Sequence, residues 1–532
     1  MDVRFEGFEV KIRVGDGAAA RGVAERVVRE HLGAGWELVP SILDPRLFEI
    51  RPRGVTMTVP ESWDRAREIG ADAGVEWAEP VLQTEGLVTE RLPVAAPVTR
   101  GTRGGGTSVP QGLVANWHCE TLHCGIRDAW NITKGEGIRI AHPDTGYMKH
   151  AEIFADGRVL ALEGFDFVAE RNDPLVLAGG STHGTATASV IISAVDPADN
   201  KTHVLGVAPR AHLIPMRVDD DVIHWRWSRA RRAVEHAIAK NCHVISMSFG
   251  GPIAGPSLHE AIQTAIANGL ILVAAAGNHV PFVVYPARYN EVICVAATTH
   301  AKAKWSGSAR GSDVDVAAPG EHVWRATMNG NVEEVAPSSG TSYATAIVAG
   351  VAALWLARHG RDALIRKYGK ANLSAVFRDV VMKHGVDVPA GWDRKNMGAG
   401  IINATKVLNA PLPATAPARG GAVTRGAVAA APPPQTHFDD IAHYFPDTPP
   451  SVVRANLVKM LNTTDAQLDA ELARFGDELK LHAALNEEIR ARLTAPVPAA
   501  GTMRGAATAA PAPPVVASRP MLSGGLRGQM GV

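Results

Sequence analysis

The central part of the chain alternates short, almost uninterrupted apolar runs with segments of helical periodicity, and this alternation constrains the fold most strongly. The apolar runs are GIRIAHPD, HLIPMRV, HVISMSFG, LILVAAAGN and EVICVAATT, and the helical segments are STHGTATASVIISAV, WRWSRARRAVEHAIAKN and SLHEAIQTAIANG. Strands that are apolar on both faces and joined through helices form parallel sheets covered by helices on both sides. We therefore expect an α/β domain with its ligand site at the carboxyl ends of the strands.

Stretches rich in Pro, Ala, Gly and Thr separate this central part from its neighbours. Such a composition buries too little apolar surface to offset chain entropy, so we interpret these stretches as linkers and a tail. The predicted order is an N-terminal domain at 1–91, a linker at 92–114, the central domain at 115–409, a linker at 410–435, a helical module at 436–493 and a disordered tail at 494–532.

The two flanking units differ in character. The N-terminal unit begins with strand alternation at residues 8–14 and continues with helical and strand-like segments in the order β-α-β-β-α-β. This order predicts a small ferredoxin-like α+β domain. The helical module places Leu468, Leu472, Phe475 and Leu479 at helical intervals. It carries no chemical signature, and we expect it to bind a protein partner that the sequence does not identify.

Composition narrows the possible partners and location. Lys plus Arg and Asp plus Glu both number 54, so charge favours neither nucleic acid nor an anionic membrane. Four cysteines are too few for a disulfide framework in a chain of 532 residues. The N-terminal residues lack the apolar core of a secretion signal, and no run approaches about 18 uncharged apolar residues. We expect a cytoplasmic protein without a membrane-spanning helix.

Four polar residues stand where the predicted sheet should open. Asp144 and Asn278 end two of the apolar strands, His183 begins a helical segment, and Ser342 precedes an apolar helix. Each alone is an ordinary turn or capping residue. Together, however, they match the needs of acyl transfer, in which an imidazole activates a hydroxyl, a carboxylate orients the imidazole and an amide stabilises the oxyanion. Their order along the chain, Asp, His, Ser, is the order found in subtilisin.

The motifs around these residues resemble those of the subtilisin-like serine peptidases, the subtilase family. The segments DTG at 144–146, HGT at 183–185 and GTSYA at 340–344 look like the three active-site signatures of that family. GVAP at 206–209, SMSFG at 246–250, AGN at 276–278, YPA at 285–287 and APG at 318–320 resemble its structural markers in the right order. The resemblance covers residues 115–409 approximately.

The resemblance implies a role for each of these residues. Ser342 would be the nucleophile, His183 the general base and then acid, and Asp144 its orienting carboxylate. Asn278 and the backbone N–H of Ser342 would form the oxyanion hole. Two backbone walls would bind an extended peptide as an added strand around the first substrate side chain; the predicted substrate-binding residues are Ser248, Phe249, Gly250, Ala275, Ala276, Gly277 and Val284. With Val284 near the pocket floor and no acid there, we expect small or medium apolar side chains at P1.

No cofactor is expected. Calcium sites are common in the family, but no ligand set can be carried over to this sequence residue by residue, and we predict no metal ligands. The segment WHCETLHC at 117–124 holds two His-Cys pairs, but its spacing fits no zinc pattern. We interpret it as a loop that leads into the central domain.

The expected function is that of a serine endopeptidase acting on protein or peptide substrates. The N-terminal domain resembles the family's propeptide, which assists folding and then occupies the cleft, and maturation would cut the chain within 82–110. A permanent N-terminal domain is the alternative. Ala346 stands where the family usually has proline, which leaves open a transpeptidase or peptide ligase acting through the same acyl-enzyme. A catalytically inactive peptide-binding scaffold is the other alternative.

Overall fold

The computed structural model describes residues 2–13, 15, 17–85, 113–154, 157–176, 180–193, 203–224, 227–417, 437–496 and 522–530. The chain forms two compact units: Leu87–Ala431, and a unit that combines Met1–Gly86 with Pro432–Val532. The N-terminal domain and the C-terminal helices, which the sequence analysis treats as separate, therefore belong together. Most of the two predicted linkers lies outside the described residues.

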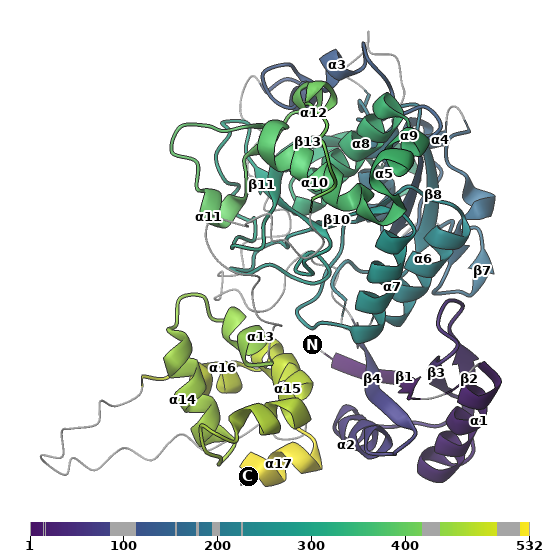
Figure 1. Ribbon diagram of the computed structural model, residues 1–532, viewed down its shortest axis with the longest axis vertical. Helices are drawn as coiled ribbons and strands as arrows, with labels where there is room; N and C mark the ends of the chain where they lie inside the picture. Colours follow the sequence, from purple (N-terminus) through teal and green to yellow (C-terminus); the bar gives the residue numbers. More distant parts are fainter. Residues whose placement is uncertain are drawn as a thin grey trace, which may run out of the picture. The chain divides into compact units, whose positions relative to one another are not determined.

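The larger unit is built on a ten-stranded sheet in the order β15-β16-β12-β11-β10-β9-β5-β8-β6-β7. Figure 1 labels β7, β8, β10 and β11 of this sheet. Its strands are β5 (Arg139–Asp144), β6 (Phe165–Asp166), β7 (Arg171–Asn172), β8 (His212–Arg217), β9 (Val244–Met247), β10 (Ile271–Ala275), β11 (Ile293–Thr298), β12 (Val316–Pro319), β15 (Val386–Asp387) and β16 (Ile401–Ile402). Neighbours from β16 to β6 pair in parallel, whereas β15 and β7 add antiparallel edges. The predicted parallel sheet is confirmed.

The sheet is covered on both faces. Every residue of β9, β10, β11 and β12 is buried, although the side chains of a strand alternate between faces. The principal helices are α5 (His183–Ile192), α6 (Ser228–Ala239), α7 (Pro256–Ala267), α8 (Thr341–His359), α9 (Arg361–Tyr368), α10 (Leu373–His384) and α12 (Ala404–Asn409), with short helices α3 (Ile126–Ala129), α4 (Ala151–Phe154) and α11 (Arg394–Met397). Helices α5 and α8 pack against each other, as do α6 and α7 (Figure 1).

Helix α8 lies inside the core. All residues from Thr341 to Leu356 are buried, which explains why this helix is apolar on every side. Among the described residues it is also the one helix whose length and composition would suit a membrane span, with 89% of its 18-residue window buried in the protein. A hairpin of β13 (Val323–Asn329) and β14 (Val332–Ser338), which the sequence analysis does not predict, leads directly into it.

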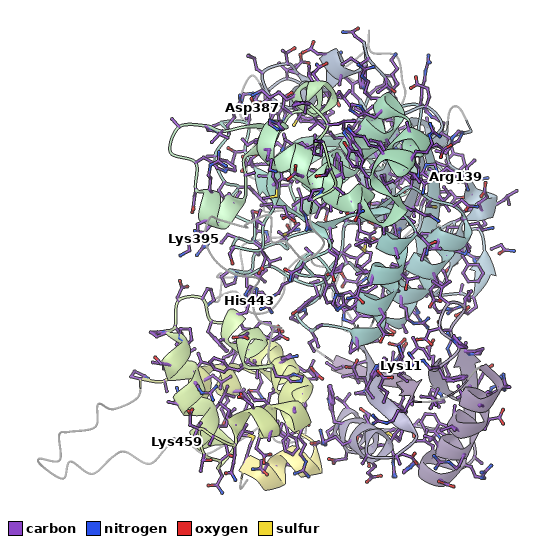
Figure 2. All side chains as sticks on the ribbon, in the orientation of Figure 1. Lys11, Arg139, Asp387, Lys395, His443 and Lys459 are labelled. Carbon is purple, nitrogen blue, oxygen red and sulfur yellow. The ribbon has the colours of Figure 1, made fainter. Side chains whose placement is uncertain are left out.

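The N-terminal part of the smaller unit has the predicted ferredoxin-like topology. Its elements are β1 (Asp2–Ile12), α1 (Gly17–Val27), β2 (Trp36–Pro40), β3 (Leu47–Pro52), α2 (Val59–Gly70) and β4 (Val75–Glu85), and the sheet order is β2-β3-β1-β4 with antiparallel pairing. A capping box between Thr58 and Glu61 fixes the start of α2. An ion pair of 2.7 Å joins the buried Lys11, labelled in Figure 2, to the partly exposed Asp44.

The C-terminal part of the same unit is helical. It contains α13 (His437–His443), α14 (Pro450–Met460), α15 (Leu468–Leu485), α16 (Glu487–Thr494) and α17 (Gly524–Met530). The four predicted apolar residues of α15 are buried in its core. Helix α17 corrects the expectation that the tail is disordered throughout: Leu522 and Leu526 of this segment are buried, and contacts described below hold it in place.

Candidate active site

Asp144 and His183 form a hydrogen-bonded pair at the carboxyl end of β5. Asp144 is the last residue of this strand, opposite the end that carries Arg139 (labelled in Figure 2), and His183 is the first residue of α5. Nδ1 of His183 donates to Oδ1 of Asp144 at 2.7 Å, and the backbone N–H of Thr145 donates to the same oxygen at 2.7 Å. The carboxylate thus assigns the imidazole proton to Nδ1 and leaves Nε2 as the basic nitrogen.

Two buried residues that the sequence analysis missed support this carboxylate. The hydroxyl of Thr187 lies 3.3 Å from Oδ2 of Asp144 and 3.0 Å from Nε2 of His142. His142 precedes Asp144 by two residues on one strand, so both side chains point to the same face, a spacing that could have revealed it.

The electrostatics of the pair favour an ionised Asp144. Burial alone would raise the pKa of its carboxyl, but the charge and hydrogen bond of His183 outweigh burial and bring the pKa below its usual range. Burial lowers the pKa of His142, despite the opposing effect of Asp144. At neutral pH the carboxylate is therefore charged and His142 is neutral.

Ser342 is the second residue of α8, at the point where the buried helix begins. Its hydroxyl donates to the carbonyl oxygen of Ser248 at 3.2 Å, and the hydroxyl of Ser248 donates to the carbonyl oxygen of Ser342 at 3.0 Å. These reciprocal bonds fix the start of α8 against the segment that follows β9. Because Ser342 lies in the first helical turn, its backbone N–H has no acceptor within the helix.

Asn278 presents its amide group beside Ser342. Its Oδ1 accepts hydrogen bonds from the backbone N–H of Thr341 at 2.9 Å and from the Thr341 hydroxyl at 2.8 Å. Both partners donate, so the oxygen faces Thr341 and the NH₂ group points away from it. The two predicted oxyanion donors thus come from the same corner of the site.

A pocket opens at this corner and contains most of the predicted substrate-binding residues. Its lining consists of Val222, Ile223, Ser248, Phe249, Gly250, Ala275, Gly277, Asn278, Val284, Thr341 and Ser342. Ala276, which was also predicted, is not among these lining residues, and it is fully buried. Val222, Ile223 and Thr341 were not predicted.

Val284 lies against both predicted backbone walls of the pocket, at Gly250 and at Gly277. A Cβ added at Gly250 would lie 2.4 Å from Cγ2 of Val284, and one added at Gly277 would lie 3.1 Å from its Cγ1. A side chain at Gly250 would therefore clash with Val284, whereas at Gly277 the contact would be tight and the φ of +117° would strain any residue other than glycine. No charged side chain contributes to the pocket lining.

Asp221 links the Asp144–His183 pair to this pocket. It immediately precedes Val222 and Ile223, whose backbone N–H groups lower its pKa, and the charge of His183 lowers it further. Burial is the larger effect, and with the help of Asp219 it raises the pKa of Asp221 to about 6. The pocket wall therefore lies within electrostatic range of His183, while the helices that begin at His183 and Ser342 pack together.

The segment at 117–124 contributes no chemistry that we can identify. Trp117, Cys119 and Cys124 are buried, and burial lowers the pKa of His118 to about 3. Within the described ranges, no group of three or more His, Cys, Asp or Glu side chains is placed to hold a metal ion.

Comparisons with known proteins point to one family. The model of the Subtilase family matches residues 135–384. Thermitase of Thermoactinomyces vulgaris is 38% identical over 238 residues, which cover 44% of this chain and 80% of thermitase. Subtilisin E of Bacillus subtilis (strain 168) is 35% identical over 231 residues, which cover 42% of this chain and 57% of subtilisin E.

A solved structure supports the fold. The crystal structure of fervidolysin from Fervidobacterium pennivorans, a keratinolytic enzyme related to subtilisin, superposes with a TM-score of 0.57 at 21% identity. The match covers 77% of this chain and 62% of fervidolysin.

Proposed function

The chain belongs to the subtilase family of serine proteases, and we propose that it is an endopeptidase whose catalytic triad is Asp144, His183 and Ser342. The observation that carries this proposal is the 2.7 Å hydrogen bond between Asp144 and Nδ1 of His183, in a site where Ser342 and Asn278 share one pocket.

In the proposed mechanism the Ser342 hydroxyl leaves the carbonyl of Ser248, gives its proton to Nε2 of His183 and attacks the scissile carbonyl carbon. Asp144 stays ionised and stabilises the imidazolium. The amide of Asn278 and the N–H of Ser342 bind the oxyanion. His183 then protonates the leaving amine as the acyl-enzyme forms, and water, activated in the same way, releases the second product and restores the hydroxyl.

The test is a Ser342→Ala variant measured on a labelled peptide library and with a fluorophosphonate probe. We expect loss of at least 1000-fold in kcat/KM, loss of labelling, and an unchanged unfolding transition. The matched control is Ser306→Ala, which removes an exposed serine hydroxyl from the same domain. Activity of Ser342→Ala equal to that of the control would exclude Ser342 as the nucleophile.

The two alternatives receive no support from the geometry. Ala346 is fully buried within α8 and is not among the residues that line the pocket. A peptide-binding scaffold would not need an oriented imidazole. Failure of the fluorophosphonate probe to label the wild-type protein would favour the scaffold, and ligated products would favour the transpeptidase.

We further propose that the N-terminal domain acts as a propeptide. Its ferredoxin-like topology supports this role, and the cut would fall within 82–110. Mass spectrometry of the wild type beside Ser342→Ala tests the proposal, because only the active protein should be cut within 82–110. An uncut wild type with full activity would contradict it. The cytoplasmic location and any calcium site stay predictions.

A further inference from the structure

The C-terminal segment 522–530 binds the N-terminal domain through a buried polar network. Arg67, on α2 of the N-terminal domain, donates through Nη1 to Oε2 of Glu478 on α15 at 2.9 Å, and through Nη2 to Oγ of Ser523 at 2.5 Å. Glu478 also accepts from the N–H of Ser523 at 2.7 Å and from its hydroxyl at 2.8 Å. The three groups come from distant parts of the chain: Glu478 follows Arg67 by 411 residues, and Ser523 follows it by 456.

Asp64 adds a second set of bonds one turn before Arg67 on the same helix. Its two carboxylate oxygens accept from the N–H groups of Gly524 at 2.8 Å and Gly525 at 3.0 Å, at the start of α17. It also pairs with Arg67 at 2.6 Å. A Cβ added at Gly525 would lie 3.0 Å from Oδ1 of Asp64 and 3.2 Å from Nη2 of Arg67, so these side chains lie close to the backbone of the tail.

The network is desolvated, which makes its loss costly. The side chain of Glu478 is fully buried and that of Arg67 is 20% exposed. Leu522, Ser523 and Leu526 are buried, and the guanidinium of Arg67 lies 5.1 Å from the ring centre of Phe475. Removing one member of a buried charged pair leaves its partner without compensation, and this penalty greatly exceeds the small effect of an exposed ion pair.

Charged side chains of the same two parts also influence one another. Glu79 on β4 lies within electrostatic range of Asp477 and Lys480 on α15. Lys480 is itself held by Asp477 at 2.8 Å and by Asp440 at 3.0 Å. Helix α15 thus hydrogen-bonds to the N-terminal domain at α2, and Glu79 adds only a charge effect.

We propose that segment 522–530 and α15 form a latch that keeps the N-terminal domain bound after the chain is cut within 82–110. The partner of this surface is the chain's own N-terminal domain. The helical module stays covalently joined to the protease domain through 418–436, so a domain held by the latch remains attached to the enzyme without a peptide bond. The cut itself rests on the proposed function, whereas the latch rests on the contacts above.

The experiment tests the latch independently of self-cleavage. A recognition site for a site-specific endoprotease is inserted in the segment 86–112 of the full-length Ser342→Ala protein, with an affinity tag in 418–436, and the added protease makes the cut. The fraction of N-terminal domain that stays on the affinity resin, and its dissociation rate on dilution, are measured. The compared variants are deletion of 522–532, Glu478→Gln, and the control Arg21→Ala, which removes an exposed ion pair on α1.

We expect the parent and Arg21→Ala to retain the N-terminal domain, and the deletion and Glu478→Gln to release it about tenfold faster or more. The deletion removes the buried residues Leu522 and Leu526, so circular dichroism must show that both domains remain folded. Glu478→Gln keeps both residues and tests the same contact without the deletion. Equal retention with and without 522–532, or release from the parent protein, would overturn the latch. Since the cut is made by an added protease, failure of self-processing in the wild type would not affect this result.

Discussion

At the scale of single residues, Asn278 illustrates how a neighbour decides the chemistry of a side chain. Both groups that contact its Oδ1 belong to Thr341 and both are donors, so the NH₂ end of the amide points away from Thr341. Thr341 in turn stands next to the proposed nucleophile. Thr341 thus orients the amide of Asn278, the proposed oxyanion donor, and precedes Ser342 in the chain.

Asp221 gives the site a testable pH dependence. Its pKa of about 6 lies above the ordinary value of 3.8, so folding favours the protonated form, and its contribution to stability falls as the pH rises from about 4 to about 6. Above pH 6 its negative charge favours protonated His183. We expect Asp221→Asn to shift the acidic limb of the kcat/KM profile down by about half a pH unit.

The control for this measurement is Asp220→Asn. Asp220 is the adjacent carboxylate, 63% exposed and paired with Arg217, so solvent screens its charge. Its profile should match that of the wild type. Identical profiles for Asp221→Asn and the wild type would show that Asp221 does not influence the ionisation that limits catalysis.

Val284 should set the size of the first substrate side chain. Val284→Ala removes two methyl groups from between the walls that contain Gly250 and Gly277. We expect kcat/KM for peptides with Leu or Phe at P1 to rise about tenfold relative to peptides with Ala at P1. Val283→Ala makes the same change in the same segment, outside the pocket lining, and should leave this ratio unchanged. An unaltered ratio in Val284→Ala would place the P1 side chain elsewhere.

At the scale of elements, the site depends on how closely α5 approaches the loop after β5. A Cβ at Gly184 would lie 1.9 Å from the carbonyl oxygen of Gly146 and 3.3 Å from Asp144. Gly184→Ala must therefore move the start of α5, and with it His183. We expect a loss of 1–3 kcal/mol in unfolding free energy, an order-of-magnitude estimate for overpacking, and at least a 100-fold loss in kcat/KM.

A variant at a second glycine serves as the control, because it should lower stability without moving His183. Gly350→Ala overpacks α8 against Val207, where an added Cβ would lie 2.5 Å from Cβ of that residue, away from the pocket. Thermal unfolding should show a comparable loss of stability for both variants. Active-site titration of the folded protein should show that Gly184→Ala is inactive and that Gly350→Ala is active. Full activity of folded Gly184→Ala would mean that α5 adjusts without moving His183.

The elements that the sequence predicts well are those with local patterns. Buried strands such as β10 and β11 have continuous apolar runs, and short motifs mark the turns that carry Asp144 and Asn278. Val222 and Ile223 belong to the pocket only through tertiary packing after β8, so no periodicity reveals them. Helix α17 was missed because contacts with α2 and α15 hold it, whereas the surrounding Pro/Ala/Gly-rich composition suggests a tail.

At the scale of the whole molecule, the two compact units do not follow the order of the chain. Residues from both ends, Met1–Gly86 and Pro432–Val532, form one unit. A conventional propeptide needs only its own connection to the protease domain. Here a cut within 82–110 leaves the connection at 418–436 intact, and the latch would keep the N-terminal domain bound to the helical module. Release of inhibition would therefore require dissociation of the latch as well as cleavage.

This arrangement predicts how the mature enzyme responds to dilution. While the latch stays bound after the cut, the N-terminal domain acts on the cleft at an effective concentration on the order of millimolar, which does not change when the protein is diluted. If the N-terminal domain occupies the cleft, the cut protein should keep the same low specific activity from micromolar to nanomolar concentration. In the protein lacking 522–532, specific activity should rise on dilution, because the freed domain leaves by mass action. Progress curves on a fluorogenic peptide at each concentration, with Arg21→Ala as the control, measure the difference. A rise of the same size in both proteins would show that the latch does not hold the inhibitor, and high activity in both at every concentration would show that the N-terminal domain does not inhibit.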